Sequence, residues 1–341
     1  MSGAPHIQQG DSIPKIMWTV VLSLVPAAIM AVIVFGLPAL NIILISILSA
    51  VLTESAINFL VKRKQTIVDG SAFVTGLLVA FNMPANVPFY VPAVASFFAI
   101  AIVKMLFGGL GFNFLNPALA GRVFVMFAWL PAMTTWVKPN PGQWFYSFFH
   151  LKPVADAITY ATPLNIIKMH GHQALLTYFG SQSALYANLF IGNIGGSLGE
   201  VSALALLIGA VILLVRKIIT LEIPLSYILT VALFTWIFGG KKGLFTGDWL
   251  FHILSGGLLL GAFFMATDMV TSPITSLGQI IFGIGAGLMT FVIRIYGGYP
   301  EGVSFSILFM NALTPIIDKY FDSRFVFRII MKKKMKMKQR G

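Results

Sequence analysis

Residues 156–164 read Asp-Ala-Ile-Thr-Tyr-Ala-Thr-Pro-Leu and form a polar stretch in a chain that is otherwise mostly apolar. A threonine hydroxyl is a nucleophile that can form a phosphoester, so Thr162 is a candidate acceptor for a covalently attached phosphate group. The small neighbour Ala161 would leave room for the catalyst of such a reaction. Thr162 is therefore one candidate for a modification site in a loop.

The same stretch also has a purely structural interpretation. Pro163 favours an extended backbone at the residue before it, and a threonine in that conformation is a good first residue for a helix. Thr159 and Thr162 could then be ordinary loop hydroxyls that cap a helix over residues 163–169. The residues alone leave both interpretations open.

Ionisable residues within apolar segments are a second group of candidates. Charged side chains at membrane depth are costly and mark functional sites by default, so Glu54 and Asp268 are candidates for an ion pathway. Alternatively, Asp268 is a helix-end carboxylate at the lipid interface, and Glu54 is interfacial because Lys62-Arg63-Lys64 follows closely. Arg122 could either extend to the interface or bind a phosphate.

Two further polar motifs favour structural roles. Residues 195–200 read Gly-Gly-Ser-Leu-Gly-Glu and could hold a phosphate at a helix N-terminus. We favour a capping box instead, because Ser197 and Glu200 have the spacing at which each side chain bonds a free backbone N–H group. Asn113 and Asn116 are expected to pair with unwound backbone, as broken helices require in lipid.

The composition indicates that the solvent is a bilayer. The 341 residues are 57% hydrophobic and 10% charged, whereas soluble domains carry about 25% charged residues. Residues 1–15 are polar, so the first apolar segment is expected to direct insertion. Cysteine is absent, which excludes iron–sulfur clusters and thiolate zinc sites carried by this chain alone. We expect no metal site in it.

Ten apolar segments are candidates for membrane helices, since a spanning helix needs about 20 mostly apolar residues. They run near residues 16–36, 38–60, 70–83, 88–107, 117–134, 198–215, 223–239, 249–266, 277–294 and 303–320. The third segment is short, and the eighth ends abruptly at Thr267-Asp268. Short or interrupted segments in both halves of a chain are typical of a site built from broken helices.

The two halves also resemble each other in sequence. Residues 76–83 read Gly-Leu-Leu-Val-Ala-Phe-Asn-Met, and residues 258–265 read Leu-Leu-Leu-Gly-Ala-Phe-Phe-Met. Five helices in each half would invert the second repeat in the membrane. We therefore predict an all-α polytopic membrane protein of about ten transmembrane helices. Residues 16–134 and 198–320 would be two inverted five-helix repeats with short or broken half-helices.

Lysine and arginine predict the orientation, because they are enriched in cytoplasmic loops. They are concentrated in Lys62-Arg63-Lys64 and in the tail of residues 321–341, so residues 1–15 and the tail are both expected in the cytoplasm. The loop of residues 135–197 is then extracytoplasmic, and its length favours a function. The basic tail is expected to face anionic membrane lipid, and no nucleic acid is expected as a partner.

Several motifs together resemble the RnfD/NqrB family of membrane subunits, over nearly the whole chain. They are Gly108-Gly109, Phe112-Asn113-Phe114-Leu115-Asn116-Pro117-Ala118, Ser197-Leu198-Gly199-Glu200, Met265-Ala266-Thr267-Asp268, Tyr299-Pro300-Glu301-Gly302-Val303-Ser304-Phe305, Asn311 and Thr314-Pro315-Ile316-Ile317-Asp318. The resemblance implies a subunit of an ion-translocating ferredoxin:NAD oxidoreductase of the bacterial cytoplasmic (inner) membrane. Such a subunit relays electrons between ferredoxin and NAD, coupled to sodium or proton transport. It has no complete active site of its own, and partner subunits carry iron–sulfur clusters and flavin.

The resemblance also implies a cofactor. The family attaches FMN through a phosphoester to a threonine in a motif like Asp-x-x-Ser/Thr-Gly-Ala-Thr, and a separate flavin transferase makes the bond. The matching residues are Asp156, Thr159, Ala161 and Thr162, with Tyr160 in place of the glycine. Asp156 could help to bind the transferase or its metal. Related subunits make a second, non-covalent flavin such as riboflavin plausible, and Asp268 could border it.

A different class of function is also compatible with broken helices in inverted repeats. Small-solute channels and secondary transporters are built in this way, and fold analogy alone does not decide between them and a redox subunit. In that case Thr162 would be unmodified and no flavin would be bound.

Overall fold

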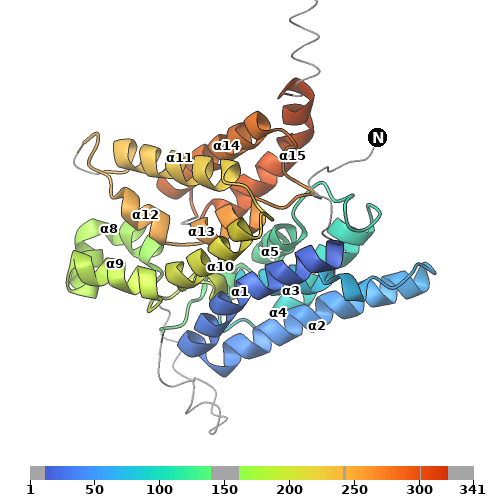
Figure 1. Ribbon diagram of the computed structural model, residues 1–341. Coiled ribbons are helices and arrows are strands. Elements are labelled where there is room, and N and C mark those ends of the chain that lie inside the picture. Colours follow the sequence, from blue (N-terminus) through green and yellow to red (C-terminus); the bar gives the residue numbers. More distant parts are fainter. Residues whose placement is uncertain (1–11, 140–160, 241–242, 300, 322–341) are drawn as a thin grey trace, which may run out of the picture.

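The computed structural model describes residues 12–139, 161–240, 243–299 and 301–321, and in these ranges the chain is helical (Figure 1). The β pairing in these ranges is a single isolated bridge between Pro84 and Ser197. Three helices are long and apolar enough to cross a membrane: α1 (Ile13–Phe35), α2 (Leu37–Leu60) and α14 (Ser276–Tyr296). The predicted fold class, an all-α membrane protein, is thus confirmed.

The first half of the chain continues from α1 and α2 into shorter helices. They are η1 (Ile67–Asp69), α3 (Ser71–Phe81), α4 (Tyr90–Phe98), η2 (Ala99–Met105), α5 (Pro117–Ala128) and α6 (Leu130–Thr134). The segment η2 is a π-helix that continues α4. Gly36 separates α1 from α2 with a φ of 70°, a conformation that glycine adopts without steric cost. Each of the first five predicted segments therefore contains helix.

The loop predicted over residues 135–197 contains two helices, α8 (Pro163–Phe179) and α9 (Gln182–Ile191). The helix α8 bends at Gly171, whose φ is 84°. Buried residues of both helices, together with Ile194 after α9, form a small apolar cluster with Phe251: Leu164, Ile166, Leu175, Leu185 and Leu189. The helical pair is thereby attached to the second half of the chain.

The second half contains η3 (Leu198–Glu200), α10 (Ala203–Val215), α11 (Glu222–Phe238), α12 (Trp249–Leu254), α13 (Leu258–Leu260), η4 (Gly261–Met265), α14 and α15 (Val303–Phe321). All five predicted segments contain helix here as well. The eighth is interrupted at residues 255–257, between α12 and α13, and η4 is a second π-helix. Glycines allow close packing of α11 on α14, since a Cβ at Gly287 would lie 2.6 Å from the Cβ of Thr230.

The two halves interlock. Helix α1 packs along α10, and α5 packs against α15, as Figure 1 shows for the first pair. A Cβ at Gly209 of α10 would lie only 2.1 Å from the carbonyl oxygen of Ser23 in α1, so the two backbones nearly touch. The similar short segments 76–83 and 258–265 are buried throughout, and their ends meet where Asn82 Nδ2 donates to Met265 Sδ (3.7 Å).

Candidate functional site

Thr162 directly precedes α8 and caps it. Its backbone is extended, and its Oγ1 accepts a hydrogen bond from the Asn165 backbone N–H at 3.2 Å. The side chain is only 4% exposed. The structure therefore confirms that Thr162 caps a helix. The attachment of a phosphate group to its hydroxyl stays a prediction. Asp156 and Thr159 lie outside the described residues, and Ala161 packs against the apolar cluster of α8 and α9.

A cavity of about 750 Å³ lies beside α8, and we call it the outer cavity. The residues of α8 that line it are Leu164, Ile167, Lys168 and His172. The opposite walls come from Gln182 and Tyr186 of α9, from residues 238–240 and 246–250, and from His252, Arg294 and Ile295. A cavity of this size is in the usual range for a small-molecule or cofactor site.

The polar groups of the outer cavity are arranged around Asp248. The Tyr186 hydroxyl donates to this carboxylate at 2.8 Å, and His172 Nε2 lies 3.7 Å from it. Burial raises the pKa of Tyr186 to about 12, and Asp248 adds to this shift, so the hydroxyl keeps its proton at neutral pH. Sequence patterns do not single out these residues, since the three lie far apart in the chain.

Two cations close the inner end of the outer cavity. Lys168 donates to the carbonyl oxygens of Arg294 (3.3 Å) and Tyr299 (3.0 Å) near the end of α14, and burial lowers its pKa. Arg294 donates to the carbonyl oxygens of His252 (2.6 Å) and Ser255 (3.0 Å). Arg294 therefore pairs with carbonyl oxygens at the end of α12, where the helix is interrupted.

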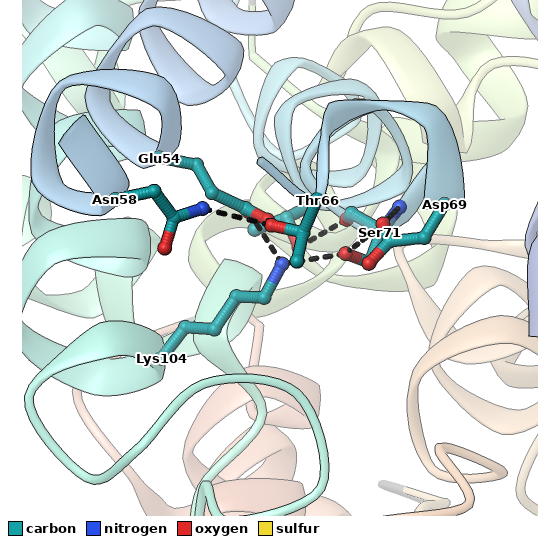
Figure 2. A network of polar contacts seen from close by, with 7 residues as sticks. Glu54, Asn58, Thr66, Asp69, Ser71 and Lys104 are labelled. Carbon is teal, nitrogen blue, oxygen red and sulfur yellow. Dashed lines mark hydrogen bonds and ion pairs between the residues drawn. The ribbon is translucent and has the colours of Figure 1, made fainter. Parts of the chain in front are cut away.

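Glu54 is buried and paired. It is 1% exposed, and its Oε2 accepts from Lys104 Nζ of η2 at 2.5 Å. Figure 2 shows how Lys104 also reaches Ser71 (2.6 Å), while Thr66 donates to the second carboxylate oxygen of Glu54. Asp69 accepts from Ser71 in turn (2.6 Å). The Glu54 carboxylate therefore lies in a polar network between helices, and its depth in the membrane stays a prediction.

Lys104 is a residue of this network that the sequence motifs do not single out. The structure buries it to 2% exposure in a π-helix, and such segments are frequent at functional sites. A signal for it is nevertheless present in the sequence, since Lys104 falls inside the apolar segment 88–107 and a lysine at that depth needs a partner.

Asp268 lies in the turn after η4. Its carboxylate accepts from the Val270 backbone N–H (3.3 Å) and the Thr271 hydroxyl (3.2 Å). It lines a cavity of about 120 Å³ together with Lys104, Asn113 and Asn116, and Glu54 lines a neighbouring one of about 480 Å³. The two cavities share lining residues: Ile16, Met17, Leu110, Met269 and Val270. The two predicted acids thus line adjoining cavities, and Lys104, the partner of Glu54, lines the cavity at Asp268.

A second buried ion pair joins the two halves at their centre. Arg122 of α5 donates to Glu301, to Ser304 of α15 (2.6 Å) and to Asn82 after α3 (3.1 Å). Its side chain is 7% exposed. Arg122 therefore neither extends to the interface nor is left free for a phosphate, and Glu301 is a partner that the sequence analysis missed.

The predicted capping box at Ser197 and Glu200 is wrong. The residues between them form a 3₁₀ turn, and the Ser197 side chain makes no capping hydrogen bond. The Leu198 N–H instead donates to the Met83 carbonyl oxygen (3.0 Å), and the buried Glu200 carboxylate lies near Arg122 and Glu301. The turn is therefore positioned by the residues after α3 and by the Arg122–Glu301 ion pair, and both are distant from it in sequence.

The predicted role of the asparagines is confirmed. Asn116 caps α5, its Nδ2 donates to the carbonyl oxygen of Met265 at 3.2 Å, and its own N–H donates to the Asn311 side chain at 3.1 Å. Asn113 bonds the Leu115 carbonyl oxygen at 3.2 Å. Among the described residues, no group of three or more His, Cys, Asp or Glu side chains is placed to hold a metal ion.

Comparison with known proteins extends these observations. The model of the NQR2, RnfD, RnfE family matches residues 1–326. The chain is 49% identical to a subunit of the proton-translocating ferredoxin:NAD(+) oxidoreductase complex of Clostridium ljungdahlii, over 94% of this chain and 93% of that protein. It is 44% identical to a subunit of the Na(+)-translocating ferredoxin:NAD(+) oxidoreductase complex of Acetobacterium woodii, over 95% of this chain and 94% of that protein. The chain therefore belongs to the NQR2, RnfD, RnfE family.

Proposed function

We propose that this chain is the RnfD-type membrane component of an ion-translocating ferredoxin:NAD oxidoreductase complex, a multi-pass bacterial membrane protein that takes part in electron transfer between ferredoxin and NAD. The observation that carries this function is the identity of 44–49% with a component of two such complexes over almost the full length of each chain. The complex couples electron transfer to transport of sodium or protons, and the chain is one subunit of this translocase.

We further propose that FMN is attached to Thr162 through a phosphoester. The described residues fit such a group. Thr162 caps the N-terminus of α8, and the N-terminus of a helix favours a phosphate through its free N–H groups and its dipole. A phosphoester at Oγ1 would place the negative charge at that end of α8. When bound, FMN supplies the electron-carrying chemistry, and the chain supplies its position.

The attachment can be tested on a denaturing gel. The full chain, co-expressed with its flavin transferase, is expected to give a band that fluoresces under ultraviolet light. Thr162→Val should abolish the band because it removes the hydroxyl, and Thr162→Ser should keep it. Thr177→Val is a matched control, since Thr177 is an exposed threonine of the same helix. A wild-type chain without fluorescence, made in the presence of active transferase, would contradict the attachment.

Other subunits must complete the path of electrons. The chain has no cysteine, so it holds no iron–sulfur cluster through thiolates of its own. We propose that partner subunits carry iron–sulfur clusters and a further flavin, and that a transferase modifies Thr162 during maturation. Lipid surrounds the exposed apolar faces of α1, α2 and α14, which include Leu22, Leu52 and Ile284.

We propose a topology of ten spans in two inverted repeats, with both termini in the cytoplasm and the Thr162 region outside. Two observations support it. All ten predicted segments contain helix, and α8 and α9 lie at the opposite side of the molecule from the C-terminal end of α2 (Figure 1). That end leads into Lys62-Arg63-Lys64, which the distribution of basic residues predicts to be cytoplasmic.

We also propose that Glu54 and Asp268 lie on the ion pathway. Supporting this role, the two acids line adjoining cavities, and Lys104, the partner of Glu54, lines the cavity at Asp268. The cavity at Asp268, about 120 Å³, is too small for a flavin, since cofactor sites usually exceed about 300 Å³. Of these two cavities, a second, non-covalent flavin such as riboflavin would fit only the one of about 480 Å³ beside Glu54.

The alternative of a small-solute channel or secondary transporter has less support. The two relatives at 44–49% identity are named as oxidoreductase components, and no observation on the described residues singles out a solute. Thr162→Val discriminates between the two functions, because a channel would keep its transport rate whereas the redox complex would lose electron flow.

A further inference from the structure

We propose that the outer cavity receives the ring system of the flavin attached at Thr162, so that one helix, α8, carries the attachment point and forms one wall of the ring site. This inference rests on the proposed attachment and goes beyond it, because it assigns the residues that surround the isoalloxazine. Nothing in the sequence motif itself identifies them.

The distance along α8 permits this arrangement. Leu164 lines the outer cavity and is two residues from Thr162, so their Cα atoms are at most about 7 Å apart. The ribityl phosphate arm of FMN is a saturated chain of comparable length. A flavin joined to Thr162 can therefore reach the cavity, whereas the cavities beside Glu54 and Asp268 are lined by other helices, and no residue of α8 lines them.

The walls of the outer cavity match the two edges of a flavin ring. Leu164, Ile167 and Leu250 present apolar surface, and the cavity is also lined by two aromatic side chains on which a flat ring can stack, Trp249 and Tyr186. Hydrogen-bonding groups line other parts of the same cavity, and they belong to Gln182, His172 and Arg294. An isoalloxazine has an apolar dimethylbenzene edge and a pyrimidine edge with donors and acceptors, so it needs both kinds of wall.

Two deeply buried side chains of the cavity have groups without partners. His252 Nδ1 and Arg294 Nε make no hydrogen bond in the described part of the chain, and the residues are 4% and 3% exposed. Buried polar groups are nearly always paired, and both residues line the outer cavity.

Cysteine protection can test the site, because the native chain contains no cysteine. Single-cysteine variants Ile167→Cys on the α8 wall and Leu250→Cys on the opposite wall are made as full chains, with and without the flavin transferase. Met169→Cys is the matched control on α8, since Met169 is 72% exposed and does not line the cavity. Each purified protein is treated with N-ethylmaleimide, and labelling is measured by mass spectrometry.

Labelling of Ile167→Cys and Leu250→Cys should be lost in the flavin-carrying chain and present in the chain made without transferase. Labelling of Met169→Cys should be equal in both. If the denaturing gel shows the fluorescent band but Ile167→Cys reacts equally in both preparations, the ring lies elsewhere and the inference is overturned. If the band itself is missing, the attachment at Thr162 has failed instead.

Discussion

The pairing of Glu54 with Lys104 shows how single charges are accommodated in this protein. Removing a carboxylate and an ammonium from water costs several kcal/mol per ion, and their attraction compensates only when the remaining hydrogen-bonding groups are satisfied. Thr66 and Ser71 supply these bonds, one on each side of the ion pair. The network connects α2, η2 and the start of α3, so it fixes the relative positions of three helices.

Removing one partner should therefore be much more harmful than removing both. Lys104→Met leaves the Glu54 carboxylate buried and unpaired, and we expect it to destabilise the subunit by about 3–5 kcal/mol. The double variant Lys104→Met with Glu54→Gln should recover most of this loss. Thermal unfolding of the full chain in detergent, followed by tryptophan fluorescence, measures both effects. Lys64→Met, at an exposed site, is the control, and equal stability of the single and double variants would contradict the argument.

At the scale of elements, the interruptions in the helices bring distant parts of the chain into contact. The break at residues 255–257 lets Leu164 of α8 and Glu200 approach the backbone, since a Cβ at Gly256 would lie 2.6 Å from Leu164 Cδ1 and one at Gly257 would lie 2.9 Å from Glu200 Oε1. The break thus connects the Thr162 helix with the buried charges at the centre.

Gly256→Ala tests that connection. Its φ of 67° is unfavourable for alanine, and its new Cβ would collide with Leu164. Gly180→Ala is the matched control, because Gly180 has a φ of 81° with open space around it. We expect Gly256→Ala to be more destabilising than Gly180→Ala by about 1–3 kcal/mol, the usual cost of overpacking. Equal melting temperatures of the two variants would show that α8 adjusts freely at this contact.

The sequence predicted where most helices lie, but it predicted few of the contacts between them. Runs of apolar residues located all ten helical segments, because length and hydropathy are local properties. The π-helices η2 and η4 and the break at residues 255–257 were not predicted, since they depend on what packs against them. The capping box at Ser197 failed for the same reason: the Met83 carbonyl oxygen, more than a hundred residues away, binds the turn.

At the scale of the whole molecule, the two halves share one polar centre. Arg122 comes from the first half, whereas Glu301 and Ser304 come from the second. Asn116 and Met265 form a further link between the halves. A rigid separation of the halves would break these buried bonds.

The predicted orientation can be measured with the cysteine-free background. Met169→Cys on α8 and Val68→Cys in η1 have similar exposures, 72% and 79% for the native residues, so differences in labelling will reflect the side of the membrane. With an impermeant maleimide on intact cells, Met169→Cys should be labelled, because a loop poor in basic residues is exported. Val68→Cys should react only after permeabilisation, since it follows Lys62-Arg63-Lys64. The reverse pattern would place α8 and Thr162 in the cytosol, and the electrons carried by an attached flavin would then never reach the outer side of the membrane.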